Sequence, residues 1–195
     1  MDKKQIEREG IRKKESVIKF VLKNKDYLFS WYEEESGEKP KDIHTDSIED
    51  LTEEEEAFIQ EVAGRYIFYY CFDKDFKQNS FESQFDGIAS GHTLEVKLCY
   101  YPFNDDTYSA NTPDYRKIRD MEDEGHIVFI YPDMAKGEHK ARLYEAGDIK
   151  IYGEIRRRGG KVNNRDKAPS RKPLYYVPHN RACDERVWKK EGNKS

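Results

Sequence analysis

The sequence has 195 residues, which is enough for one domain of ordinary size and leaves no room for a second core of comparable size. A formal net charge of only -4, together with several compact apolar runs, argues against a fully disordered chain. No apolar stretch approaches the roughly 20 residues that cross a bilayer, and the first residues lack the apolar run of a signal peptide, so we expect a soluble, cytoplasmic protein without a membrane partner.

Residues 1–50 are predicted to form a helix followed by a linker. Apolar residues recur at helical spacing through residues 3–29, which predicts a packing helix. Residues 33–47 show no periodicity and many acidic side chains, which is typical of a linker. Either Ser47 or Thr52 can then cap the next helix.

That next helix is predicted over residues 51–63, and a buried strand is predicted to follow it. Glutamates crowd the first turn of the helix, where the positive end of the helix dipole favours them. Glu55 lies within the apolar stripe, so its carboxylate needs a partner. The run at residues 66–72 is rich in aromatic and β-branched residues, which predicts a strand.

Two further runs are predicted to pair as a hairpin through a two-residue turn at Ser90-Gly91. In that register Asp86 sits opposite Glu95. The period of two along a strand then places Asp86, Glu95 and Lys97 on one face. The other face is predicted to carry four apolar side chains, those of Phe85, Leu94, Val96 and Leu98.

The second half of the chain predicts a helix and several strands. A helix is expected at residues 114–124, stopped by Gly125, and a buried strand at residues 126–131. A strand, helix, strand sequence favours a parallel crossover. Further strands are expected at 142–144, 149–155 and 174–177, and residues 183–195 read as a charged tail.

The cysteines and histidines carry no recognisable ligand spacing. The three cysteines, Cys71, Cys99 and Cys183, lie far apart without a CxxC pair, which favours free thiols over a disulfide framework or a zinc site. His126, His139 and His179 likewise lack the spacing of metal ligands.

Charge is distributed unevenly along the sequence. The segment from Glu33 to Glu61 has thirteen acidic residues and two lysines, a net charge of -11. The segment 156–172 has eight basic residues and one aspartate, a net charge of +7, and Gly159, Gly160 and Pro169 interrupt it. Such an arm can follow a phosphate backbone, although most charge runs are solvated surface loops. Its candidate nucleic-acid-binding residues are Arg156, Arg157, Arg158, Lys161, Arg165, Lys167, Arg171 and Lys172.

The hairpin residues are of the types that hydrolyse phosphodiesters. Such hydrolysis needs a metal ion that orients the phosphate, carboxylates that hold the ion, and often a lysine that orients the attacking water. Magnesium, or manganese, prefers oxygen ligands, which Asp86, Glu95 and the main-chain carbonyl of Val96 can supply. Lys97 would supply the amine. The alternative interpretation is a solvent-facing strand with a cross-strand ion pair and no function.

The [DE]xK triplet itself occurs five times in this charged chain, so context has to select among its copies. Only Glu95-Val96-Lys97 lies in an apolar strand paired through a tight turn with a strand that bears an aspartate. A rival copy, Pro132-Asp133 followed by Asp148-Ile149-Lys150, matches the letters of the motif well, but no helix and buried strand follow it in order.

The predicted element order over residues 51–131 resembles the αβββαβ core of PD-(D/E)XK nucleases, which is the restriction-endonuclease-like fold. The resemblance implies an α/β (α+β) domain with a mixed sheet, an N-terminal helix and a β-rich basic C-terminal extension. It implies that Asp86 and Glu95 bind the metal and that Lys97 is the motif lysine. Glu55 matches the helix glutamate that many members add. Phe85 stands where the motif has proline.

We therefore expect a nuclease-like core at 51–182 that acts as a Mg²⁺- or Mn²⁺-dependent endonuclease, on DNA rather than RNA. Symmetric cutting of duplex DNA would need a homodimer. Two alternatives remain open: an inactive nucleic-acid-binding protein of the same fold, and an acidic module that mimics DNA or binds a basic protein.

Overall fold

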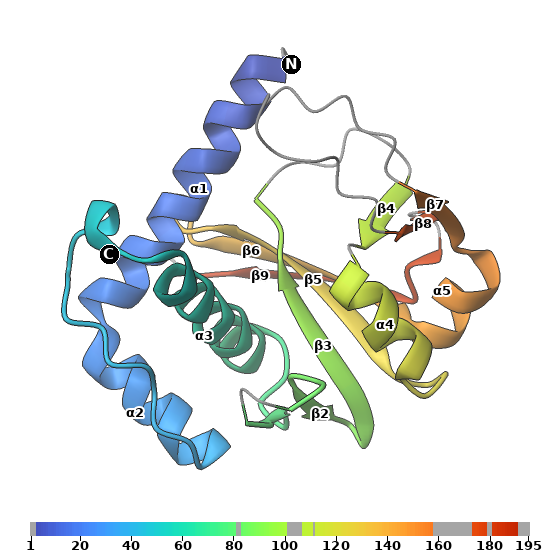
Figure 1. Cartoon of the computed structure of the whole chain (residues 1–195), viewed down its shortest axis with the longest axis horizontal. Helices are drawn as coiled ribbons and strands as arrows, with labels where there is room; N and C mark the ends of the chain where they lie inside the picture. The colour runs from blue at the N-terminus through green and yellow to red at the C-terminus, as the bar shows by residue number, and fades with distance from the viewer. Residues whose placement is uncertain are drawn as a thin grey trace.

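The computed structural model describes residues 3–80, 83–100, 107–110, 112–157, 173–178 and 181–190. It shows an α/β architecture in which helices lie on both sides of a mixed sheet (Figure 1). Among the described residues, no helix combines the length and the apolar character that crossing a membrane requires. The elements are α1 (Lys3–Lys23), α2 (Lys25–Ser36), a 3-10 turn (Ile48–Asp50), α3 (Glu53–Cys71), β1 (Lys77–Gln78), β2 (Gly87–Ala89), β3 (His92–Leu98), β4 (Thr107–Ala110), α4 (Thr112–Asp120), β5 (His126–Asp133), β6 (Glu138–Glu145), α5 (Ala146–Tyr152), β7 (Glu154–Arg157), β8 (Pro173–Pro178) and β9 (Asp184–Lys189).

The main sheet has six strands in the order β1-β2-β3-β5-β6-β9 within the described part of the chain. β3 and β5 pair in parallel and the other neighbours are antiparallel. One face packs on α3 through a cluster that includes Leu94, Val96 and Val128. The other face packs on α4 and α5 through a cluster that includes Ile118 and Phe129. A separate three-stranded sheet has the order β4-β8-β7.

The N-terminal segment forms two helices where one was predicted. α1 ends at Lys23 and α2 begins at Lys25, because the side-chain amide of Asn24 bonds back to the Phe20 carbonyl and interrupts the helix. α2 continues to Ser36, into the predicted linker, and ends at Gly37, whose φ of 72° suits a residue without a Cβ. Both helices pack on α3.

The prediction of a strand at residues 66–72 was wrong, because α3 runs without a break from Glu53 to Cys71. Its aromatic residues pack along the helix at a spacing of four, as in the stacked pair Tyr66–Tyr70, with ring centroids 5.7 Å apart. Gly64 does not end the helix. A Cβ at Gly64 would meet the Leu98 side chain at 3.4 Å, so this glycine allows α3 to lie close to β3.

The predicted hairpin register is confirmed. Gly87 faces Leu94 and Ala89 faces His92, and the turn residues Ser90 and Gly91 both have positive φ, as a type I′ turn requires. β2 begins only at Gly87, however, so strand alternation does not extend to the residues before it. Phe85 therefore packs with the α4-side cluster instead of joining Leu94 and Val96.

In the second half of the chain, β5 agrees with the prediction, whereas α5 and β9 were not predicted. β5 is buried and pairs in parallel with β3 across α4, as the crossover argument predicted. Residues 149–152, predicted as part of a strand, belong to α5. Ile149 packs in the same cluster as Ile118 of α4, so only one side of this short helix is buried. The expected charged tail contains β9, which pairs with β6 along its length.

Candidate functional site

The candidate site lies at the edge of β3, where β2 stops pairing with it. Figure 1 shows β3 running between α3 and α4, with β2 beside its first half only. The β2–β3 ladder ends at the Gly87–Leu94 pair, so among the described residues the strand from Glu95 onward pairs only with β5. Side chains from α3, from the segment before β2 and from α4 converge on this edge.

Asp86 occupies the place that a neighbouring strand would take. Its Oδ2 accepts a hydrogen bond from the main-chain N–H of Val96 at 2.6 Å, and its Oδ1 accepts one from the Arg65 guanidinium at 3.0 Å. The residue is only 5% exposed. Because both oxygens of this buried carboxylate accept hydrogen bonds, the side chain is held in one position.

Glu95 is fully buried, with 0% exposure, and two lysines face it. The Lys97 Nζ lies 2.6 Å from Oε1, and the Lys117 Nζ lies 2.7 Å and 2.9 Å from the two carboxylate oxygens. Burial raises the pKa of Glu95, and the nearby charge of Asp86 raises it further, while both lysines lower it. The carboxylates of Asp86 and Glu95 therefore interact electrostatically.

A third acid, Glu61, reaches the same group from α3. It forms a close ion pair with Arg65, one helical turn further along. Burial, joined by the charge of Asp86, raises the pKa of Glu61 to about 7 against the attraction of Arg65. The site thus gathers three carboxylates, of Glu61, Asp86 and Glu95, against three cations.

Four of these residues, Glu61, Asp86, Lys97 and Lys117, border a hollow of about 230 Å³ between α3 and α4. The side chains of Lys97 and Lys117 are 33% and 26% exposed, so their amines reach both Glu95 and solvent. The hollow is open and polar, which suits a charged group approaching from solvent better than an apolar ligand. Its lining residues are Ala57, Gln60, Glu61, Ser83, Asp86, Val96, Lys97, Leu98 and Lys117.

The structure brings Asp86, Glu95, Val96 and Lys97 together and places Glu55 elsewhere. Glu55 closes a capping box at the start of α3, where its carboxylate accepts from the Thr52 N–H at 2.8 Å. These hydrogen bonds lower the pKa of Glu55. The carboxylate that α3 directs at the site is that of Glu61, so the prediction for Glu55 was wrong by less than two turns.

The rival motif is not assembled in the structure. Asp148 and Lys150 lie on α5, and the Lys150 amine bonds to the Met121 carbonyl and to Asp123. Asp133, at the end of β5, instead pairs with Lys13 and Lys136. In the basic arm, the backbone of Arg156 and Arg157 belongs to β7, and Arg158, Lys161, Arg165, Lys167, Arg171 and Lys172 lie outside the described residues.

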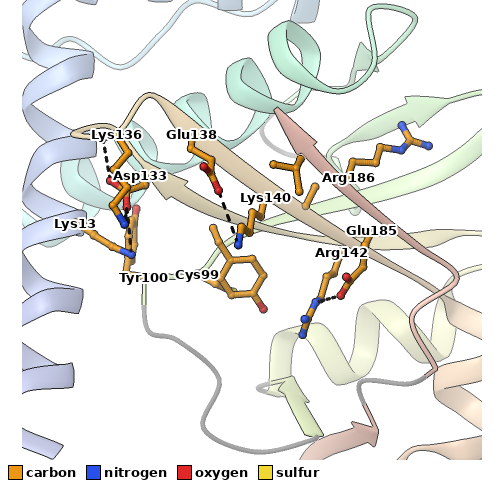
Figure 2. A pocket seen from close by; sticks show the side chains of 13 residues that line it. Lys13, Cys99, Tyr100, Asp133, Lys136, Glu138, Lys140, Arg142, Glu185 and Arg186 are labelled. Atoms are coloured by element: carbon orange, nitrogen blue, oxygen red, sulfur yellow. Dashed lines mark hydrogen bonds and ion pairs between the residues drawn. The ribbon is translucent and has the colours of Figure 1, made fainter. Parts of the chain in front are cut away.

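A second, larger hollow of about 430 Å³ lies where β3 ends (Figure 2). Cys99 borders it, directly after the end of β3 and two residues beyond Lys97. Five cations and three acids line it, and all three acids have basic neighbours, as in the Arg142–Glu185 pair. The cations are Lys13, Lys136, Lys140, Arg142 and Arg186, so the lining carries a net charge of +2 (five minus three).

Sequence reasoning missed Glu61, Arg65 and Lys117. Each had a local signal: Arg65 is a lone charge inside the apolar run from Val62 to Phe68, and Glu61 stands four residues before it. Lys117 directly precedes the buried Ile118 on α4.

Comparisons of the chain with protein-family models, with curated proteins and with solved structures found no match in any of the three.

Proposed function

We propose that the protein is a metal-dependent nuclease of the PD-(D/E)XK type. The observation that carries the proposal is the convergence of two buried carboxylates, those of Asp86 and Glu95, with the amine of Lys97 at an open strand edge. Within the main sheet, the order α3, β1, β2, β3, α4, β5 also supports a restriction-endonuclease-like αβββαβ core. The short strand β1 takes the place assigned to residues 66–72.

The donor set fits a hard divalent cation such as Mg²⁺ or Mn²⁺. Asp86 and Glu95 would hold it, and both are carboxylates whose mutual repulsion a cation relieves. N–H and C=O of one residue in an extended strand point to the same edge, so the Val96 carbonyl is directed as its N–H is, toward Asp86. Bound there, the ion would neutralise and orient the phosphate.

The remaining side chains have separate tasks in this proposal. Lys97 orients the attacking water and stabilises the charge that develops on the phosphate, because its amine is at the solvent side of Glu95. Lys117 also holds Glu95, through contacts with both of its carboxylate oxygens. Arg65 and Glu61 fix Asp86 in place, which makes them positioning residues.

Nucleic acid is the proposed substrate, with duplex DNA favoured over RNA. The cation-rich hollow at the end of β3, which Cys99 borders two residues beyond Lys97, offers a further surface for a phosphate backbone. The basic segment 156–172, with its net charge of +7, adds to the same proposal on sequence alone. We further propose that symmetric cutting of a duplex requires two copies of the chain.

Incubation of the purified protein with supercoiled plasmid tests this function. We expect nicked and linear products in Mg²⁺ or Mn²⁺, no products in excess chelator, and at least a hundredfold slower cleavage by Asp86→Asn. Salt-sensitive DNA binding without cleavage in any metal would instead identify an inactive nucleic-acid-binding protein of this fold. Failure to bind DNA at all would favour the acidic protein-binding module.

The acids of the site also predict a pH dependence of metal stabilisation. The folded-state pKa of Glu61, about 7, lies above its ordinary value of 4.5, and the pKa of Glu95 is raised as well. In metal-free protein these groups contribute stability at pH values below their ordinary pKa, and the contribution is lost as pH rises through the folded pKa. The ion needs the deprotonated form of its ligand Glu95, and the negative charge of deprotonated Glu61 nearby also favours it, so Mg²⁺ should raise the melting temperature more at about pH 8 than at about pH 6.

Two glutamates of α3 provide a matched pair for this measurement. Glu61→Gln removes a titrating group of the site, so it should reduce the difference between the two pH values. Glu55→Gln changes a glutamate in the capping box at the start of α3 and should leave the difference unchanged. An equal metal-induced shift of the melting temperature at both pH values in the wild-type protein would contradict the prediction.

A further inference from the structure

Four adjacent strands present metal-ligand side chains at one end of the main sheet, apart from the candidate nuclease site. β3, β5, β6 and the segment leading into β9 are neighbours in the sheet. At this end they carry His92, His126, Glu145 and Cys183 in that order. Leu94, two residues beyond His92, pairs with His126, and His126 pairs with Glu145, so the row crosses the sheet at nearly one level.

Three of these side chains already meet. One donor atom from each of His126, Glu145 and Cys183 lies within 4.8 Å of the other two. In a tetrahedral site with ligands at about 2.0–2.3 Å from the metal, donor atoms stand roughly 3.3–3.8 Å apart. The three donor atoms must therefore approach one another by about an ångström, which side-chain rotation allows. The backbone of each ligand is fixed: two are paired in strands, and the Cys183 N–H bonds to the Leu143 carbonyl at 2.9 Å.

The donor types select the metal. One nitrogen, one carboxylate oxygen and one sulfur form a set that zinc accepts and that magnesium does not, because magnesium requires oxygen ligands. His92 stands beside the group, with its ring centroid 5.8 Å from that of His126 in an edge-on contact. His126 is half-buried, whereas Glu145 and Cys183 are exposed, so an ion can enter from solvent.

We propose that His126, Glu145 and Cys183 form a zinc site, with His92 beside its fourth position. The site would tie the start of β9 to β5 and β6, and β9 is the outermost strand at that side of the sheet. Its role is therefore to hold the edge strand in place. The Cys183 thiol now donates to the Leu143 carbonyl at 3.3 Å, and zinc binding would replace that weak hydrogen bond with a metal–thiolate bond.

This site was not found from the sequence, because its ligands come from positions 126, 145 and 183, with no short spacing among them. All three cysteines are free thiols, as predicted, and burial raises the pKa of the Cys71 thiol to about 12. The inference does not rest on the proposed nuclease function, since the two sites share no residue.

Titration of the metal-free full chain with Co²⁺, a spectroscopic substitute for zinc, tests the proposal. We expect a thiolate-to-cobalt charge-transfer band that saturates at one equivalent and is removed by one equivalent of Zn²⁺. Cys183→Ser should abolish the band, and His126→Ala should weaken Co²⁺ binding at least tenfold. Zn²⁺ should raise the melting temperature of the wild-type chain and not that of Cys183→Ser.

Two control variants separate this site from other metal binding. Cys71→Ser should retain the full band, and Asp86→Asn should retain it while losing plasmid cleavage. The absence of a thiolate band in the wild-type chain, or its persistence in Cys183→Ser, would overturn the proposal. Circular dichroism spectra in chelator that match the wild type show that Cys183→Ser and His126→Ala are folded, so that a lost band reports a lost ligand.

Discussion

Replacing Lys97 with alanine is expected to slow metal-dependent DNA cleavage by about 10²- to 10⁴-fold, the range typical of a positioned acid–base group. The Lys97 amine lies 2.6 Å from the Glu95 carboxylate, and its side chain is partly exposed to solvent. The fold should survive, because Glu95 keeps its two contacts with Lys117. Initial rates of plasmid nicking, measured at saturating Mg²⁺, give the fold-change directly.

Lys150→Ala is the matched control for this variant. Lys150 belongs to the rival Asp148-Ile149-Lys150 triplet and lies on α5, bonded to Asp123 and to the Met121 carbonyl. We expect cleavage by Lys150→Ala at the wild-type rate. If Lys97→Ala cuts as fast as the wild type, or if Lys150→Ala is the inactive variant, the assignment of the site to β3 is wrong.

Replacing Arg65 with leucine is expected to lower the free energy of unfolding by about 3–5 kcal/mol, the cost of breaking a buried ion pair from one side. Arg65 is only 1% exposed, and its guanidinium donates to Asp86 at 3.0 Å and to the Asn79 carbonyl at 2.7 Å. Without the guanidinium, the carboxylates of Asp86 and Glu61 would repel each other at a buried site with no cation between them. Urea unfolding in chelator measures the loss.

Metal ions offer a second readout for the Arg65 variant. A divalent ion at Asp86 would replace part of the lost charge, so saturating Mg²⁺ should recover some of the stability of Arg65→Leu. Arg119→Ala removes an exposed arginine of α4 and should leave unfolding nearly unchanged. A destabilisation of Arg65→Leu below about 1 kcal/mol would show that the Asp86 carboxylate does not depend on this partner.

The sequence predicted the part of the fold that local rules determine. The type I′ turn at Ser90-Gly91 fixes the hairpin register, and a strand with alternating apolar residues fixes which face Glu95 and Lys97 share. The buried run at residues 126–131 likewise predicted β5 and its parallel pairing. In each case the signal lies within a few consecutive residues.

Tertiary packing decided the rest. The aromatic composition of residues 66–72 favours a strand, yet contacts of α3 with α1, α2 and the sheet extend the helix through them. The same extension determines which glutamate reaches the site. Glu55 lies at the capped first turn, and Glu61, facing Arg65, lies beside β3. Asp86 reaches the Val96 N–H only because β2 starts one residue later.

A crystal grown or soaked with Mn²⁺, in which anomalous scattering locates the ion, tests the proposed metal site most directly. We expect an ion bound by Asp86 and Glu95, in contact with the Val96 carbonyl, with the Lys97 amine displaced from its present 2.6 Å contact with Glu95. An anomalous map with no ion between these two carboxylates at saturating Mn²⁺, and with Lys97 still paired to Glu95, would contradict it.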